Sequence, residues 1–368
     1  MKEEITAFEL SRLIPELQAV VGGKVEKIYN PEDREITLEF HISGEGRKIL
    51  RIVAGKFLYL ASSKGDNPEK PSQFCMGLRK HIDNTKLLSI EQHGFERIVE
   101  LKFQHKDEKR IMIIELFGQG NIVICDPNYR IITLFSTQIS KDRELKRGKE
   151  YVFPKSKFDF LHLTEGAFEE MLDDKEIVKS LAINLSLGGT YSEEVCLNAE
   201  IDKKKKANSL NDKEKKAVFS ALTKLRDAKN NPALYETGEI APIKLGFFEK
   251  SGKKTFDSFN SALDSVLTKK REAKIITDIS SKKDKEIAKI QNIIDLQKKQ
   301  LDTIKTDIED NKKKGDAIYE NYQLIQEIMT ELKKAREKYS WKEIKEKLKN
   351  HKVIKSVDEK TGEIIIEL

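Results

Sequence analysis

Residues 97–125, RIVELKFQHKDEKRIMIIELFGQGNIVIC, decide the fold of the first part of the chain. They contain three apolar runs, Arg97–Phe103, Arg110–Phe117 and Asn121–Cys125, each short enough to be a single strand. Charged residues separate the first two runs, and Gly118-Gln-Gly120 separates the second from the third. Apolar runs of this length between turn residues predict neighbouring strands of an antiparallel sheet.

The same pattern extends on both sides of this stretch and defines an N-terminal domain over residues 1–163. Six further apolar or alternating runs predict strands at Val25–Tyr29, Glu35–Phe40, Lys48–Val53, Phe57–Leu60, Leu87–Gln92 and Ile131–Phe135. One helix is expected to open with a capping box formed by Thr6 and Glu9, and a second helix to follow Ser72. We therefore expect an α+β multidomain chain whose first domain is a largely antiparallel sheet, open or folded into a sandwich, flanked by two helices.

Residues 164–231 have the pattern of a helix-hairpin-helix domain. Helical runs flank Leu187-Gly188-Gly189, and such a hairpin can direct backbone N–H groups and a helix N-terminus toward a phosphate. The alternative is an ordinary helix end with glycine in the left-handed conformation. Residues 202–216 contain seven lysines against three acids. This basic run favours phosphate binding by Gly188 and Gly189 together with Lys203, Lys204, Lys205 and Lys206, although a solvated loop is the alternative for the lysines.

Residues 269–339 carry the periodicity of a coiled coil. From Ile287 onward, eleven of fourteen a and d heptad positions are apolar or aromatic, and the register continues across Asn311–Asp316. We expect one continuous helix from Ile275 to Lys338, about 95 Å long at 1.5 Å per residue. A helical hairpin turn at Asn311–Asp316 is the alternative. The apolar seam needs a partner, which is either a second copy of the chain in a homodimer or a segment that folds back.

Two smaller segments flank this arm. Residues 232–268 return to strand and helix signals, including a strand at Ile243–Phe248, and are expected to rejoin the N-terminal module. Residues 340–368 predict a small α/β cap, with a helix after Ser340 and two strands. Because the sequence stops inside the apolar run Ile364–Leu368, we expect it to be truncated within a larger middle domain.

The composition limits the class of protein. The chain has 38% hydrophobic and 35% charged residues and a net charge of +6, so solvated helix is expected beside the compact domains. Cys75, Cys125 and Cys196 form no disulfide framework or zinc motif, and we expect no cofactor and no metal. No apolar stretch is long enough to span a membrane, and a cytoplasmic protein is expected. Common nucleophile, phosphate-loop and zinc-hydrolase motifs are absent, so we expect no enzymatic activity.

Several separate blocks of the sequence resemble the NFACT family, which includes RqcH of bacteria and archaea and NEMF of eukaryotes. The blocks are MKEEITAFELSRLIPEL, KVEKIYN, SQFCMGLRKHI, FERIVEL, IELFGQGNIVICD, LSLGGTYSEEVCLNA and ENYQLI…SWKEI. The resemblance implies an N-terminal domain similar to formamidopyrimidine-type DNA glycosylases, a helix-hairpin-helix domain, and a long coiled coil with a small middle domain at its tip. The family's return arm and C-terminal RNA-binding domain would be absent.

The resemblance also implies a function in ribosome-associated quality control. Members of the family bind large ribosomal subunits that still carry peptidyl-tRNA, and they recruit tRNA, chiefly tRNA-Ala, for C-terminal tailing of the stalled chain. The residues that correspond to the family's tRNA-binding positions are Glu9, Glu96 and Arg97, and Arg79 and Lys80 are further candidates. Both acids stand where aspartate is usual. The alternatives are a purely capping role for Glu9 and a weak surface pair for Glu96-Arg97.

Three other classes of protein are alternatives to this function. The absence of a signal peptide and the free thiols argue against an extracellular adhesin. A DNA glycosylase-like DNA-binding protein would use an N-terminal proline, whereas this sequence begins Met1-Lys2. A coiled-coil scaffold would account for the arm taken alone. The salt dependence of RNA binding distinguishes a scaffold from an RNA-binding protein.

Overall fold

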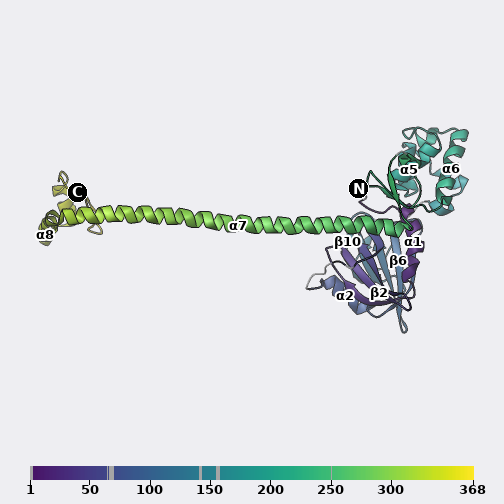
Figure 1. Cartoon of the computed structure of the whole chain (residues 1–368), viewed down its shortest axis with the longest axis horizontal. Helices are drawn as coiled ribbons and strands as arrows, with labels where there is room; N and C mark the ends of the chain where they lie inside the picture. Colours follow the sequence, from purple (N-terminus) through teal and green to yellow (C-terminus); the bar gives the residue numbers. More distant parts are fainter. Residues whose placement is uncertain (1–2, 64, 66–69, 141–142, 155–157, 250) are drawn as a thin grey trace. The chain divides into compact units, whose positions relative to one another are not determined.

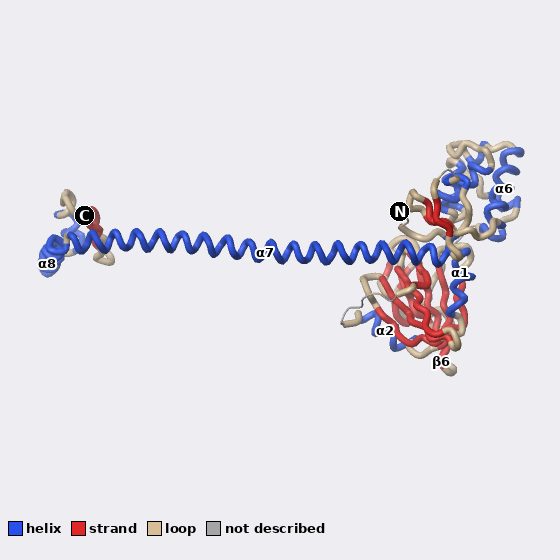
Figure 2. Tube along the Cα trace, viewed as in Figure 1, coloured by secondary structure: helices blue, strands red, loops and turns tan. Residues whose placement is uncertain are grey.

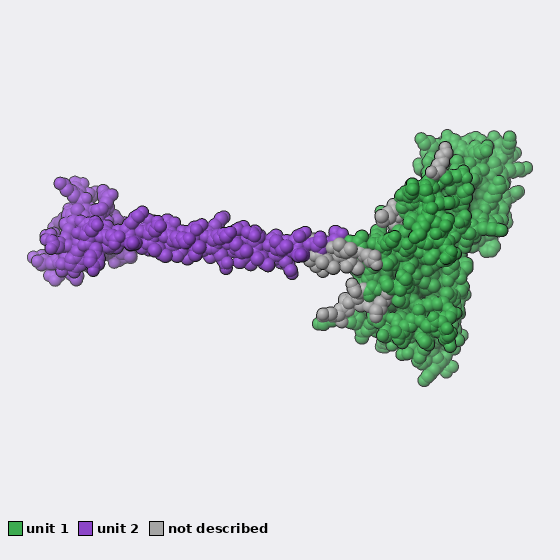
Figure 3. Space-filling view, in the orientation of Figure 1, with its two compact units in different colours: residues 1–273 green, residues 274–368 purple. Residues whose placement is uncertain are grey.

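The computed structural model describes residues 3–63, 65, 70–140, 143–154, 158–249 and 251–368, so Met1 and Lys2 lie outside the described residues. The chain divides into two compact units, residues 1–273 and residues 274–368 (Figure 3). No helix in the described part of the chain combines the length and the apolarity that a membrane crossing requires.

The first unit is built on a large sheet, whose strands are red in Figure 2. The sheet has nine strands in the order β4-β3-β2-β1-β5-β6-β7-β8-β9. Every neighbouring pair is antiparallel. The strands are β1 Lys24–Tyr29, β2 Glu35–Ile42, β3 Gly46–Val53, β4 Phe57–Ala61, β5 Lys86–Gln92, β6 Ile98–His105, β7 Glu108–Glu115, β8 Asn121–Cys125 and β9 Ile131–Leu134. The expected antiparallel sheet is confirmed, and Gly118-Gln-Gly120 forms the turn between β7 and β8.

The sheet folds on itself, so of the two expected forms, an open sheet and a sandwich, the domain adopts the second. β1 and β5 share one ladder pair, Lys24 with Lys86, and a few backbone hydrogen bonds beside it, so a four-stranded half and a five-stranded half meet at a narrow joint. Apolar side chains of both halves lie in one buried core, among them Leu38 and Leu50 from one half and Leu101 and Met112 from the other. A single continuous sheet therefore encloses the core in the manner of a sandwich.

Two helices cover this domain. α1 (Ala7–Leu17) opens with the expected capping box, in which the Thr6 hydroxyl accepts from the Glu9 N–H and the Glu9 carboxylate accepts from the Thr6 N–H. It packs against β4 and β5. α2 (Gln73–Ile82) is capped by Ser72 and packs against β1 and β9.

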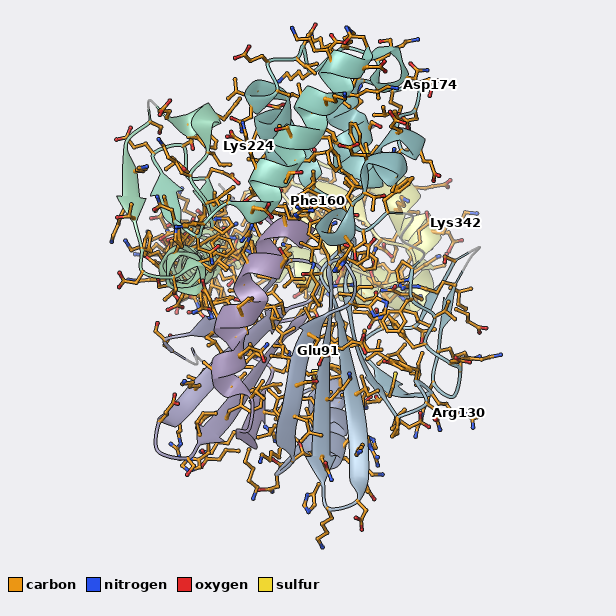
Figure 4. The ribbon with its side chains drawn as sticks, turned by 90° about the vertical axis from the view of Figure 1, so that its right-hand side faces the viewer. Glu91, Arg130, Phe160, Asp174, Lys224 and Lys342 are labelled. Carbon is orange, nitrogen blue, oxygen red and sulfur yellow. The ribbon has the colours of Figure 1, made fainter. Side chains whose placement is uncertain are left out.

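Four further helices form a second core. They are α3 Glu165–Glu170, α4 Ile177–Asn184, α5 Gly188–Asn198 and α6 Asp212–Asp227. Phe8 from α1 and Phe95 from the β5–β6 loop are buried in the same apolar cluster. Both rings contact Phe160, which lies between the end of the sheet and these helices (Figure 4). This shared core holds the helical hairpin against α1 and the sheet.

Two small sheets lie on either side of the helical hairpin in the sequence, one before α3 and one after α6. β10 (Gln138–Ile139) pairs with β11 (Glu144–Leu145), and β12 (Ala233–Tyr235) lies between β13 (Ile240–Ala241) and β14 (Lys253–Thr255). The strand expected at Ile243–Phe248 is wrong, because Gly246–Phe248 forms a 3-10 turn. The Glu194 carboxylate accepts from the N–H groups of Gly246 and Phe247, which bends the backbone away from a strand.

The arm is helical except for a break at Asn321. α7 (Phe259–Glu320) is 62 residues long, about 93 Å at the helical rise, and it continues through Asn311–Asp316 as the heptad register predicted (Figure 1). The helix signal expected within residues 232–268 and the arm expected from residue 269 form one helix, whose residues Phe259, Ala262 and Leu263 are buried in the core of the first unit. The expectation of one continuous helix is wrong beyond Glu320, because the helix is interrupted at Asn321 and resumes as α8 (Tyr322–Lys338).

The end of the chain forms the expected small α/β cap. α9 (Trp341–Lys347) opens with a capping box made by Ser340 and Glu343, and β15 (Ile354–Val357) pairs with β16 (Ile364–Ile366). Ile328 and Leu332 of α8 are buried against α9 and β15 in a small core of their own.

Candidate nucleic-acid interface

An open cavity of about 360 Å³ in the first unit brings together segments that are far apart in the sequence. Three of its walls carry residues that the sequence singled out: the start of α1, the β5–β6 loop and the α4–α5 hairpin. The lining residues are Glu4, Thr6, Glu96, Arg97, Phe117, Pro154, Ala182, Ser186 and Gly188.

The β5–β6 loop is held firmly enough to present Glu96 and Arg97. The His93 N–H donates to the Ile98 carbonyl at 2.9 Å, and the Glu96 N–H donates to the His93 carbonyl at 3.2 Å. The Gln92 side-chain amide donates both to the Glu96 carbonyl and to the Ala7 carbonyl of α1. The loop is therefore fixed to α1, and its two charged side chains have a defined place in the cavity wall.

The two side chains differ in their surroundings. The Arg97 guanidinium is 26% exposed and forms an ion pair with Glu4 at 2.8 Å. The Glu96 carboxylate has neither a hydrogen bond nor an ion pair to any residue that the structure describes. A fixed guanidinium beside an available carboxylate offers both donors and an acceptor to a polar ligand.

The glycine hairpin forms the opposite wall. Gly188 has a φ of +74° and is the first residue of α5, whereas the left-handed residue that ends α4 is Ser186, with a φ of +53°. The alternative of a plain glycine helix end therefore does not describe Gly188 or Gly189. Among the described residues no side chain caps the N-terminus of α5, and a Cβ on Gly188 would lie 3.2 Å from the Thr6 methyl group. Glycine lets this helix end approach α1 closely.

Glu9 is buried beneath the glycine hairpin and does not line the cavity. Its side chain is completely buried; one carboxylate oxygen accepts from the Thr6 N–H at 2.9 Å and the other from the Tyr191 hydroxyl at 2.8 Å. Burial, and then the negative charge of Glu9, raise the pKa of Tyr191 well above its ordinary value. Glu9 thus joins α1 to α5, and its capping role is confirmed.

The four lysines lie at the other end of the hairpin helices. The Lys203 and Lys205 carbonyls accept from the N–H groups of Val178 and Ile177, so the lysine turn covers the start of α4. Gly188 follows the end of α4, eight helical residues away, which is about 12 Å. The expected single phosphate site of glycines and lysines is therefore divided into two places. The sequence did not reveal this separation, because residues that are close along the chain can lie at opposite ends of an antiparallel helix pair.

Ion pairs also reduce the charge that the lysine turn offers. Lys203 pairs with Glu193 at 2.9 Å, and Lys205 pairs with Glu214 at 2.6 Å. Lys204 and Lys206 are exposed and pair with no acid among the described residues.

Arg79 and Lys80 lie on α2 and do not line the cavity. The Arg79 guanidinium donates twice to the Ile28 carbonyl, at 3.1 and 2.7 Å, and so ties α2 to β1. Lys80 is exposed.

Sequence reasoning missed several lining residues. Phe117 and Pro154 reach the cavity only through the folding of the sheet, and no local pattern marks them. Glu4 had a weak signal, since it stands two residues before the Thr6 cap, but its partner Arg97 is in a different hairpin.

Comparison with known proteins gives consistent matches. Residues 6–363 match the family model described as NFACT N-terminal and middle domains. The archaeal Rqc2 homolog aRqcH of Methanocaldococcus jannaschii is 33% identical over all of this chain and 58% of its own length. The ribosome quality control complex subunit NEMF homolog of Drosophila melanogaster is 23% identical over 95% of this chain and 42% of its own length. The chain thus spans little more than half of the archaeal relative.

A solved structure shows the same fold. The N-terminal part of the fibronectin/fibrinogen-binding protein from Streptococcus suis superimposes with a TM-score of 0.59 and 22% identity, and the match covers 72% of this chain and all of that one.

Proposed function

The chain belongs to the NFACT family, and from this premise we propose that it acts in ribosome-associated quality control as a tRNA-binding factor. It binds obstructed large ribosomal subunits that carry peptidyl-tRNA and recruits tRNA-Ala for C-terminal tailing of the stalled chain. In this proposal the ribosome forms the peptide bonds and the chain positions tRNA. The names of the archaeal and eukaryotic relatives support the role in ribosome quality control.

One observation carries the proposal for tRNA. Glu96 and Arg97 lie on the same cavity as Gly188 at the start of α5, although they come from different domains. Arginine can contact a base edge or a phosphate through its planar fork, and a carboxylate accepts from a base amino group or a ribose 2′-hydroxyl. The uncapped N-terminus of α5 adds a favourable potential for an anion.

Arg97→Ala tests this assignment in the full chain. We expect affinity for a tRNA-Ala transcript to fall by about 1–3 kcal/mol if the arginine makes a bidentate contact. The free energy of unfolding should change by at most about 1 kcal/mol, because the pair with Glu4 is partly exposed. Arg97→Lys should restore binding poorly, since an ammonium group lacks the planar fork. Glu96→Asp should be tolerated.

Arg110→Ala is the matched control. Arg110 is 22% exposed and pairs with Glu108 at 2.7 Å, but it lies on β7, next to the β6–β7 turn at the far end of β6. This variant should bind tRNA as the unmodified chain does. Equal losses for Arg97→Ala and Arg110→Ala, or loss of affinity only in proportion to unfolding, would show that the cavity is not the tRNA site.

A further inference from the structure

In the cavity proposed for tRNA, an acidic side chain already forms an ion pair with the arginine. Among the lining residues that the structure describes, the charged groups are two carboxylates, Glu4 and Glu96, and one guanidinium, Arg97. The Glu4 carboxylate lies 2.8 Å from the Arg97 guanidinium. A polyanion that enters this cavity therefore meets an arginine whose charge is already neutralised, beside a second negative charge.

The chain around Glu4 is fixed in a way that allows the Glu4 side chain to move away from Arg97. The next residue, Ile5, is fully buried, and its N–H donates to the Lys56 carbonyl at 2.9 Å, so the chain is fixed from that point onward. Glu4 precedes this anchor, is 51% exposed, and has no partner other than Arg97 among the described residues. An outward movement of residue 4 breaks one exposed ion pair and disturbs no part of the core.

We infer that Glu4 is an internal competitor that holds the place of an RNA phosphate on Arg97 and sets the affinity of the site. Both a carboxylate and a phosphate offer oxygens to the guanidinium fork, so one can replace the other. Binding of RNA then consists of an exchange, in which Glu4 moves into solvent and the phosphate takes over Arg97. A ligand without a strong anion cannot make this exchange, which gives the cavity a preference for nucleic-acid backbone over neutral polar ligands. This inference rests on the proposed function.

Glu4→Gln in the full chain tests the exchange, with a tRNA-Ala transcript as the probe. Removal of the competitor should tighten binding by about two- to fivefold, the factor that corresponds to loss of an exposed ion pair. Glu3→Gln is the matched control, because Glu3 is adjacent, exposed and unpaired among the described residues, and its change alters the net charge equally. The control should change affinity much less.

A double-mutant cycle separates competition for Arg97 from simple repulsion of RNA. If Glu4 acts through Arg97, Glu4→Gln should have no effect when Arg97 is already alanine. If Glu4 acts as a negative charge near the phosphate, the gain should persist in the double variant.

The outcomes distinguish this inference from the function on which it rests. Tighter binding by Glu4→Gln that disappears in the Arg97→Ala background supports the exchange. The exchange is overturned if Glu4→Gln leaves the affinity unchanged or weakens it, if Glu3→Gln and Glu4→Gln give equal gains, or if the gain persists without Arg97. In each of these cases, a loss of affinity caused by Arg97→Ala alone still supports the tRNA site. No effect of Arg97→Ala on tRNA affinity overturns both.

Discussion

Glu9 and Tyr191 lie 182 residues apart, and their hydrogen bond is the clearest case in which the sequence predicted half of a residue's role. The spacing of Thr6 and Glu9 predicted the capping box, because that motif is local. The Tyr191 hydroxyl is supplied by a different domain, and no local pattern indicates it. For the same reason the family resemblance pointed to Glu9 as a tRNA contact, whereas the structure buries it beneath the cavity.

Tyr191→Phe should destabilise the first unit by about 1–3 kcal/mol at neutral pH, because it removes the hydroxyl that donates to the buried Glu9 carboxylate. The pKa of Tyr191 is raised in the folded state, so the stability it contributes is present below pH 10 and is lost as the pH rises further. That loss is about 1.4 kcal/mol per pH unit for one tyrosine. Urea unfolding from pH 7 to pH 11 should therefore show a shallower alkaline decline for Tyr191→Phe.

Tyr319→Phe is the control for this measurement, since Tyr319 is 85% exposed. It should match the unmodified chain at every pH. A Tyr191→Phe variant with unchanged neutral stability would mean that water replaces the hydroxyl and that the Glu9 contact has little energetic value.

At the scale of elements, the β3–β4 and β7–β8 turns meet at two glycines. The Gly55 N–H donates to the Glu115 carbonyl at 2.9 Å, and a Cβ on Gly120 would lie 1.9 Å from the Gly55 nitrogen. Gly120→Ala should therefore destabilise the domain by at least about 3 kcal/mol, among the larger effects of single substitutions.

Gly118→Ala is the control, because Gly118 also has a positive φ, of +56°, but nothing lies within 4 Å of its Cβ position. Its cost should be only about 1–2 kcal/mol of backbone strain. Similar urea midpoints for the two variants would contradict a role for the contact between the turns.

The lysine turn leads to a prediction about salt dependence. Lys204→Ala with Lys206→Ala should reduce the slope of log affinity for tRNA against log salt by about 0.7–0.9 for each lysine that contacts a phosphate. Lys203→Ala with Lys205→Ala should change the slope less and cost up to about 1 kcal/mol of stability for each lost pair, because these lysines are bound to Glu193 and Glu214. If neither pair changes the slope, the turn is merely solvated.

The elements were predictable where their signals are local. The strands of the large sheet were predicted to within about two residues because apolar runs and turns alternate along an antiparallel meander, whereas the short strands β10 to β14 were not predicted. The helix through Asn311–Asp316 followed from an unbroken heptad register. The cavity was not predictable, because Arg97, Gly188 and Glu4 meet only through packing between domains. The strand expected at Ile243–Phe248 failed for the same reason, since the distant Glu194 determines that turn.

At the scale of the whole molecule, the apolar seam of α7 is uncovered among the described residues. Ile287, Ile294, Leu301 and Ile308 at the a positions are 38–61% exposed. A coiled-coil seam is stabilised only when a second helix covers it. We expect the 368-residue chain to self-associate through the arm, so that its mass in sedimentation equilibrium rises with concentration.

Leu301→Glu with Ile308→Glu should abolish this association. The control is Thr303→Glu with Thr306→Glu, which adds the same charge at outer heptad positions of the same turns. A monomer at every concentration would contradict the prediction, and so would equal dissociation by both pairs of substitutions.

The burial of the first residues of α7 has a consequence for amide hydrogen exchange. Phe259, Ala262 and Leu263 belong to the core of the first unit, and the Glu16 carboxylate accepts from the N–H groups of Phe259 and Asn260. In the dissociated chain, amides just after these residues become accessible to deuterium only when that core opens, whereas amides beyond residue 283 lie on an exposed helix and exchange by local opening. The boundary between slowly and rapidly exchanging amides should therefore fall within α7, although the backbone geometry of the helix does not change there.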